Sequence, residues 1–255
     1  IKIVRAERAY DAETKARFER EARATSALVS PHTVTVFDFG ESADGSWFLA
    51  MELLEGESLG ERLRRVTRLQ VADAVRIARQ AAVSLGEAHT KGIIHRDLKP
   101  DNLFLTHVPV KSGEPEEIVK VLDFGIAKLV RGDDQHVDQL ETQAGTVFGT
   151  PRYMSPEQAQ GAALDARTDV YSLAVILYQM LAGRPPFVDD DAVVVMACHI
   201  KDDPPRLAQV APEARIAPAV EAVVRRALSK EPQGRQQSAE QLVAELDAAI
   251  AQTVG

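Results

Sequence analysis

The sequence predicts an α+β protein in which a small, strand-rich N-terminal unit precedes a larger, mainly helical unit. In the first part, short apolar runs alternate with turn residues, which is typical of strands. Beyond Gly56, apolar residues recur at three- and four-residue steps, as in amphipathic helices. Residues 168–182 are apolar nearly all round, which indicates a buried central helix. We therefore expect two units, residues 1–54 and 55–255.

The N-terminal unit begins with an expected strand at Ile1–Val4 and a charged helix from Asp11 to about Leu28. Asp11 suits the N-cap of this helix, and Ser30-Pro31 ends it. Two further strands are expected at 34–40 and 47–53, joined through a turn at Asp44-Gly45.

A helix is expected near residues 71–91, because its apolar positions share one helical face and Gly92 supplies a stop. The apolar runs 103–105 and 118–122 then predict a hairpin with a long tip. The tip, 106–117, is longer than such a hairpin needs, and we assign it no role. Later helices are expected at 168–182, 190–200, 218–228 and 238–251.

Composition narrows the class of protein. The chain has 255 residues, 45% of them hydrophobic and 27% charged, as in ordinary soluble proteins. Its net charge of −8 argues against a nucleic-acid partner, because phosphate contacts need a basic face. The run Arg62-Leu63-Arg64-Arg65 is interpreted as a solvated helix face. Cys198 is the only cysteine, which excludes internal disulfides and cysteine-rich zinc sites.

No targeting signal is visible, and the apolar segment 170–181 is too short and too interrupted to span a bilayer. The chain starts at Ile1 rather than at a methionine, so we expect a piece of a longer protein. A cytoplasmic location is expected, either free or as the cytoplasmic domain of a larger membrane-anchored protein.

Two motifs carry the functional prediction. Residues 95–102, His-Arg-Asp-Leu-Lys-Pro-Asp-Asn, fill every fixed position of H-R-D-L-x-x-x-N, and residues 123–125 read Asp-Phe-Gly. With these motifs the chain resembles the eukaryotic-like (Hanks-type) serine/threonine protein kinases of bacteria. The resemblance implies a bilobal protein-kinase-like fold with a truncated, small, β-rich N-lobe and a mainly helical C-lobe.

The resemblance also implies ATP-dependent transfer of phosphate to serine and threonine hydroxyls of protein substrates. Asp97 would accept the hydroxyl proton, and Lys99 would neutralise the transferring phosphoryl group. Asn102 and Asp123 would hold Mg²⁺, or Mn²⁺, through oxygen atoms. A lysine at position 99 resembles the serine/threonine branch of the family.

The nucleotide site is predicted from the N-terminal unit. Lys2 would hold the α- and β-phosphates and pair with an acidic residue on the next helix, which offers Glu13, Glu19 and Glu21. Glu21 matches the family position best. Four residues would form the adenine site, with Met51 as gatekeeper, the backbone of Glu52 and Leu54 bonding the base, and Phe104 beneath it.

Residues 149–157 resemble the substrate-positioning loop and A-P-E motif, with Ser155 in place of alanine. By resemblance, Thr150 would bond toward Asp97 and Lys99. Glu157 would pair with Arg235, and Asp169 would tie the central helix to the backbone of the catalytic loop, residues 95–102.

An arginine before the catalytic aspartate, here Arg96, implies a phosphate on the activation segment. Thr142, Thr146 and Thr150 are candidates, and Thr142 best matches the autophosphorylated position of bacterial relatives. We expect autophosphorylation at Thr142 or Thr146, and dimerisation as a route to activation.

The chain also departs from the family at its start: G-x-G-x-x-G is absent, since only Ile1 precedes Lys2. We interpret this as truncation and expect this chain alone to bind ATP weakly and transfer phosphate poorly. Two alternatives stay open, a nucleotide-binding, pseudokinase-like regulatory scaffold and a small-molecule phosphotransferase. Retention of Asp97 and Asp123 favours the protein kinase.

Overall fold

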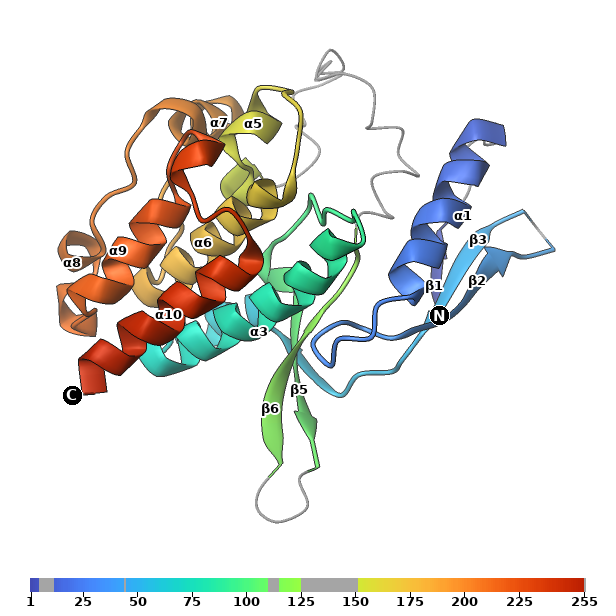
Figure 1. The fold of residues 1–255 in the computed structure, drawn as a ribbon, viewed down its shortest axis with the longest axis horizontal. Coiled ribbons are helices and arrows are strands. Elements are labelled where there is room, and N and C mark those ends of the chain that lie inside the picture. The colour runs from blue at the N-terminus through green and yellow to red at the C-terminus, as the bar shows by residue number, and fades with distance from the viewer. Residues whose placement is uncertain (5–11, 44, 110–114, 125–150, 255) are drawn as a thin grey trace.

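The computed structural model describes residues 1–4, 12–43, 45–109, 115–124 and 151–254. Figure 1 shows a helical body, a small sheet flanked by one helix at the N-terminal side, and a hairpin that projects from between them. The predicted α+β class is confirmed.

The first sheet contains β1 (Lys2–Val4), β2 (Val36–Glu41) and β3 (Trp47–Met51) in the order β1-β3-β2, with antiparallel pairing. Helix α1 (Ala12–Ser26) packs against it through Phe18 and Ala22. The rings of Phe18 and Trp47 stack with centroids 4.6 Å apart, so aromatic burial holds helix and sheet together. Asp11 and Asp44 lie outside the described residues.

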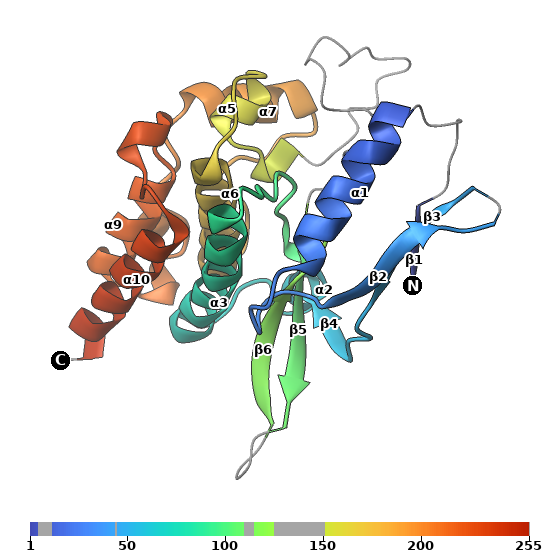
Figure 2. The ribbon, with the colours of Figure 1, turned by 45° about the vertical axis from the view of Figure 1, so that its right-hand side comes forward.

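The second sheet contains β4 (Gly56–Ser58), β5 (Leu103–Val108) and β6 (Glu116–Val121), again antiparallel. The predicted hairpin is confirmed, but its strands reach further than expected, so the connection covers only 109–115. Figures 1 and 2 show the hairpin extending away from the helical body. The expected boundary after residue 54 falls between the two sheets and stays a prediction.

The outer edge of β6 is covered by groups from elsewhere in the chain. Val121 pairs with the backbone on either side of Thr33. The amide of Val119 donates to Gln80 Oε1 at 2.8 Å, and Arg76 Nη1 donates to the carbonyl of Glu117 at 2.8 Å. An open strand edge would otherwise invite pairing with another chain. The two backbone bonds of Val121 also fasten the segment before β2 to the second sheet.

The helical body is built around α6 (Ala166–Ala182), most of whose residues are buried. Helix α3 (Val71–Thr90) packs against it, and α9 (Pro218–Ala227) and α10 (Ala239–Val254) complete the layer. Shorter helices lie around this layer: α2 (Leu59–Val66), α5 (Pro156–Ala159), α7 (Ala192–Lys201) and α8 (Leu207–Val210). Among the described residues, no helix combines the length and apolar character needed to cross a membrane.

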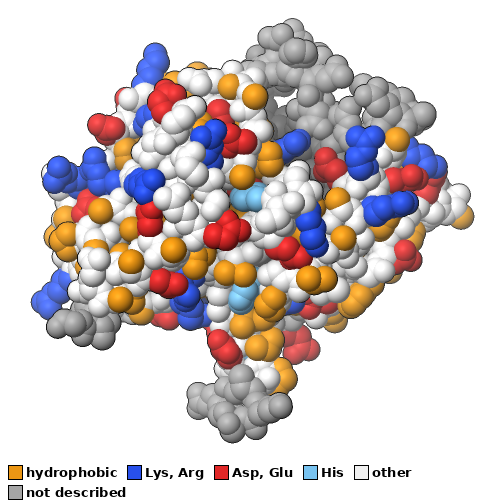
Figure 3. Space-filling model, in the orientation of Figure 1, with side chains coloured by type: hydrophobic (Ala, Val, Ile, Leu, Met, Phe, Trp, Pro, Cys, Tyr) orange, Lys and Arg blue, Asp and Glu red, His pale blue; other side chains and the backbone are white. Residues whose placement is uncertain are grey.

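The arginine run on α2 differs from its prediction. Arg64 and Arg65 are exposed, as expected. Arg62, in contrast, is only 22% exposed in its side chain and pairs with Glu57 and with Glu117, at 2.5 and 2.7 Å. Its partners come from β4 and β6, so packing of the second sheet decides its environment. Elsewhere on the surface seen in Figure 3, acidic and basic side chains are interspersed.

Candidate active site

The catalytic loop lies between α3 and β5 and is fixed by the central helix. Asp169, fully buried on α6, accepts hydrogen bonds from the amides of His95 at 2.8 Å and Arg96 at 3.0 Å. The predicted tie between helix and loop is therefore confirmed. Arg96 and Asp123 both adopt left-handed backbone conformations, with φ of 63° and 57°. Such conformations are uncommon for residues other than glycine and persist where surrounding contacts hold them.

The two residues predicted to act on the phosphoryl group lie together. Lys99 Nζ is 3.0 Å from Asp97 Oδ2, and both side chains are about one-third exposed, at 34% and 37%. An extended segment places side chains two residues apart on one side. A hydroxyl group arriving from solvent can therefore reach both groups.

Asn102 joins the loop to the strand that precedes Asp123. Its side-chain Nδ2 donates to the backbone carbonyl of Asp97 at 2.8 Å, while the backbone carbonyl of Asn102 accepts from the amide of Leu122 at 2.9 Å. His95 reinforces the same junction, because its Nε2 lies 2.8 Å from the carbonyl of Leu122. Three predicted residues are thus connected directly, and Asp123 is connected through its neighbour.

The oxygen atoms at this junction fit a hard divalent cation. The amide nitrogen of Asn102 is used on Asp97, which leaves the side-chain oxygen as the possible metal ligand. Mg²⁺ is usually bound by one or two protein oxygens together with substrate phosphates and water. No group of three or more histidine, cysteine, aspartate or glutamate side chains is found among the described residues that could hold a metal by itself.

Residues 50–54, which hold the predicted adenine-site residues Met51, Glu52 and Leu54, are called the hinge segment. This segment contains an ion pair that the sequence analysis missed. Glu52 accepts from Lys120 Nζ at 2.8 Å and from the amide of Thr35 at 2.7 Å. Burial raises the pKa of Glu52, but the hydrogen bonds from Lys120 and Thr35 outweigh it and the net pKa is lowered. Lys120 also donates to the carbonyl of Thr33 at 3.3 Å. A lysine inside the apolar run 118–122 was the signal available in the sequence.

Of the other predicted adenine-site residues, Phe104 lies opposite Lys120 in the second sheet, and Met51 and Leu54 lie close to Glu52 in the chain. Met51, Leu54 and Phe104 are each partly exposed. The amide of Glu52 donates to the carbonyl of Thr35 at 3.0 Å, so the backbone carbonyl of Glu52 is the group left for a base.

Gly56, with φ of 146°, allows β4 to approach β5: a Cβ there would lie 2.0 Å from the carbonyl oxygen of Leu105.

Lys2 lies opposite Leu49 in the first sheet, but its side chain falls outside the described residues. Glu21 lies on α1 and is partly exposed. Their ion pair therefore stays a prediction. Thr142, Thr146 and Thr150 also lie outside the described residues.

The predicted pair of Glu157 and Arg235 is confirmed. The guanidinium binds both carboxylate oxygens, each at 2.7 Å, and is fully buried. Its remaining N–H groups donate to three backbone carbonyls, those of Ser229, Arg167 and Lys230, at 2.8, 3.0 and 2.8 Å. All five donors of Arg235 are thus satisfied. The pair anchors α5 to the connection between α9 and α10.

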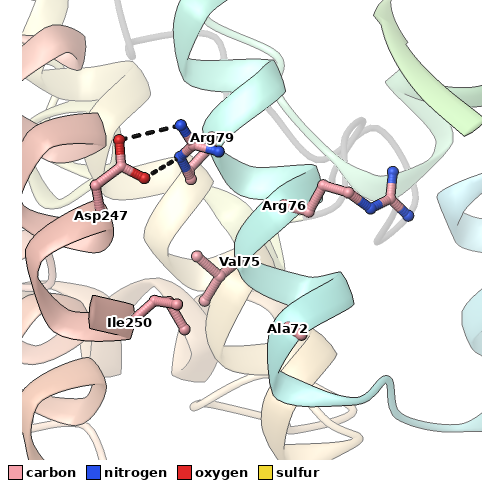
Figure 4. A pocket seen from close by; sticks show the side chains of 6 residues that line it. All are labelled: Ala72, Val75, Arg76, Arg79, Asp247 and Ile250. Atoms are coloured by element: carbon pink, nitrogen blue, oxygen red, sulfur yellow. Dashed lines mark hydrogen bonds and ion pairs between the residues drawn. The ribbon is translucent and has the colours of Figure 1, made fainter. Parts of the chain in front are cut away.

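A groove between α3 and α10 lies elsewhere in the helical body (Figure 4). Ala72, Val75 and Ile250 form its apolar part, and an ion pair between Arg79 and Asp247 crosses one end. None of these residues belongs to the predicted site.

Comparison with known proteins agrees with this geometry. The protein kinase domain family matches residues 1–246. The serine/threonine-protein kinase pkn3 of Myxococcus xanthus is 46% identical over 248 residues, which cover 97% of this chain and 44% of that protein. The serine/threonine-protein kinase PknB of Mycobacterium tuberculosis is 36% identical over 252 residues, covering 96% of this chain and 38% of that protein.

The crystal structure of the Mycobacterium tuberculosis PknI kinase domain superposes with a TM-score of 0.71 at 29% identity, covering 97% of this chain and 84% of that one. The fold is that of the protein kinase class. The chain belongs to the protein kinase family, and the relatives described are bacterial serine/threonine kinases. It spans less than half the length of the two curated relatives.

Proposed function

We propose that the chain transfers the γ-phosphate of ATP to serine and threonine hydroxyls of protein substrates, with Asp97 as the catalytic base. The observation that carries this proposal is the junction at Asn102, which holds the Asp97 backbone and the strand leading to Asp123 in one hydrogen-bonded unit. A base and two oxygen ligands connected in this way are what phosphoryl transfer requires.

In this proposal Asp97 orients the substrate hydroxyl and accepts its proton, and Lys99 neutralises charge on the phosphoryl group. Their hydrogen bond of 3.0 Å keeps both groups at the same place before substrate arrives. Asn102 and Asp123 would hold Mg²⁺ or Mn²⁺, which when bound offsets the charge of the phosphates.

The nucleotide would lie against the hinge. The carbonyl of Glu52 and the backbone of Leu54 would bond adenine, with Met51 behind the base and Phe104 beneath it. Lys2, paired with Glu21, would hold the α- and β-phosphates. Because ATP is the phosphate donor, we place the domain in the cytoplasm.

Regulation is proposed through the activation segment. A phosphate at Thr142 or Thr146, added by the chain itself, would pair with Arg96 and order that segment. Dimerisation would bring the segment of one copy to the site of another. Mapping of phosphorylated residues after incubation with ATP tests this, and an active protein without phosphate at either threonine contradicts it.

The test of the reaction itself is Asp97→Ala in the full-length protein. We expect phosphate transfer to a generic protein substrate to fall by roughly 100-fold or more, since general-base catalysis contributes about 10²–10⁴-fold. Nucleotide affinity should stay within about threefold, because the proposed nucleotide contacts do not involve this side chain. Asp101→Ala, which removes an exposed carboxylate from the same loop, is the matched control.

Wild-type protein that binds ATP with Mg²⁺ but transfers no phosphate would contradict the proposal and favour the regulatory scaffold. Transfer that survives in Asp97→Ala at the level of Asp101→Ala would contradict the assigned base.

A further inference from the structure

The backbone of Arg96 is held from both sides. Its left-handed conformation, with φ of 63°, is unfavourable for an arginine and needs support from its surroundings. On the amide side, Asp169 accepts the hydrogen bonds of His95 and Arg96. On the carbonyl side, Gln158 Nε2 donates to the oxygen of Arg96 at 2.7 Å. The peptide group that leads directly into Asp97 is therefore fixed by a side chain from α5.

Gln158 is itself fixed by the start of its helix. Ser155 is the N-cap of α5, and its hydroxyl oxygen accepts from the amide of Gln158 at 3.3 Å. In return, the amide of Ser155 donates to Gln158 Oε1 at 3.1 Å. These bonds form a capping box. Because the oxygen of the Gln158 side chain faces an N–H and its nitrogen faces a carbonyl, the orientation of the amide is determined by its partners.

The serine that replaces alanine in the A-P-E motif thus has a structural consequence. Ser155 is fully buried, and its capping box aims the NH₂ group of Gln158 at the catalytic loop. Glu157, which lies between Ser155 and Gln158 in the sequence, binds Arg235 instead of the catalytic loop. One short helix therefore connects the helical body to the carbonyl of Arg96.

We propose that Gln158 is a positioning residue for the reaction, which holds the peptide between Arg96 and Asp97 in the orientation that phosphoryl transfer requires. This inference rests on the proposed function of Asp97. Gln158 acts through the backbone of the loop, since its side-chain partners among the described residues are Ser155 and the carbonyl of Arg96 rather than Asp97, Lys99 or Asn102. Small displacements of a reacting group lower catalytic rates steeply, so a loss of this bond should affect turnover more than binding.

The test is Gln158→Glu in the full-length protein. Glutamate preserves the capping box, since its carboxylate accepts from the amide of Ser155, but it has no donor for the carbonyl of Arg96. We expect kcat to fall about tenfold and KM for ATP to stay within about twofold. The melting temperature should fall by only a few degrees, because the capping box is kept and one hydrogen bond, that to the carbonyl of Arg96, is lost.

Gln160→Glu is the matched control, because it makes the same change at an exposed position two residues along. Ser155→Ala is the complementary variant, which removes the cap hydroxyl while it retains the NH₂ group of Gln158. We expect it to lower the melting temperature and to reduce kcat less than Gln158→Glu does. A kcat for Gln158→Glu within twofold of Gln160→Glu would overturn the inference. So would a fall in kcat that merely tracks a loss of melting temperature.

Amide hydrogen exchange separates this inference from the proposed function. The amide of Asp97 donates to the carbonyl of His95 at 2.8 Å and reports on the loop without any turnover. We expect it to exchange faster in Gln158→Glu than in Gln160→Glu. Unchanged exchange would refute the positioning role, even in a wild-type protein that proved inactive and so contradicted the proposed function alone.

Discussion

Glu157→Gln is expected to be among the most destabilising single substitutions in the helical body. In the structure, the carboxylate accepts two hydrogen bonds from Arg235 and a third from the hydroxyl of Thr168 at 2.9 Å. Glutamine has nearly the same volume, so the change removes the negative charge without leaving a cavity. It also turns an NH₂ group toward a guanidinium that has only donors. Arg235 would then remain fully buried as an unpaired cation.

The expected cost is about 3–5 kcal/mol, the range found when one partner of a buried ion pair is removed. This is a large part of the roughly 5–15 kcal/mol that stabilises a typical domain. For a chain of this size, about 1 kcal/mol lowers the melting temperature by roughly 2–4 °C. Glu157→Gln should therefore lower it by roughly 6–20 °C. The carbonyl bonds of Arg235 and its stacking 4.8 Å from the centroid of the Tyr171 ring limit further loss.

Urea unfolding at pH 7 measures this cost, with the m-value as a check that the cooperative unit is unchanged. The pH dependence gives a second measurement. Burial raises the pKa of Glu157, but the bonds from Arg235 outweigh it and the net pKa is lowered. The pair therefore stabilises the fold at pH values above the unfolded pKa of Glu157, about 4.5. This stabilisation is lost as pH falls through the folded pKa of Glu157.

Glu157→Gln should lack that acid-dependent component. Glu213→Gln, which changes an exposed glutamate on the same body, is the control. A loss below about 1 kcal/mol at pH 7, the value of an exposed pair, would refute the reasoning that burial makes this pair costly to break.

Two further predictions concern Lys120 on β6 and His199 on α7. Lys120→Met removes the partner of Glu52 in the hinge segment. We expect KM for ATP to rise roughly three- to tenfold, with KM for protein substrate unchanged. Equal changes in both KM values would contradict a local effect on the nucleotide site. His199, buried on α7, bonds Tyr171 and the carbonyl of Arg152, at 2.9 and 3.1 Å, and burial is the main cause that lowers its pKa to about 4. It therefore stabilises the fold in its neutral form, and that stability should be lost as pH falls from about 6.5 to 4. The free energy of unfolding in urea should show this pH dependence in the wild type and lack it in His199→Gln. The same pH dependence in both proteins would contradict the prediction.

The chemistry of the catalytic loop could be predicted from the sequence because it is local. Asp97, Lys99 and Asn102 lie within six residues, and an extended segment fixes how such neighbours share a side. The helices of the body were predictable for a similar reason, since their apolar residues recur at the period of the helix itself. Their expected bounds lie within a few residues of those observed for α3 and α6.

Contacts between distant parts of the chain were predictable only where the family resemblance supplied them. Glu157 with Arg235 and Asp169 with the loop were expected in this way, and both are confirmed. Lys120 with Glu52 was missed, because a lysine in a strand carries no mark of its partner.

The sequence by itself predicted the candidate catalytic residues, the α+β class and most helices, since each depends on residues close together along the chain. Only the tertiary structure decided how the loop is held: Gln158 reaches Arg96 from 62 positions away, and Asp169 reaches it from 73. Hydrogen bonds across such separations depend on how whole helices pack, and packing sums many weak contacts that no short stretch of sequence contains.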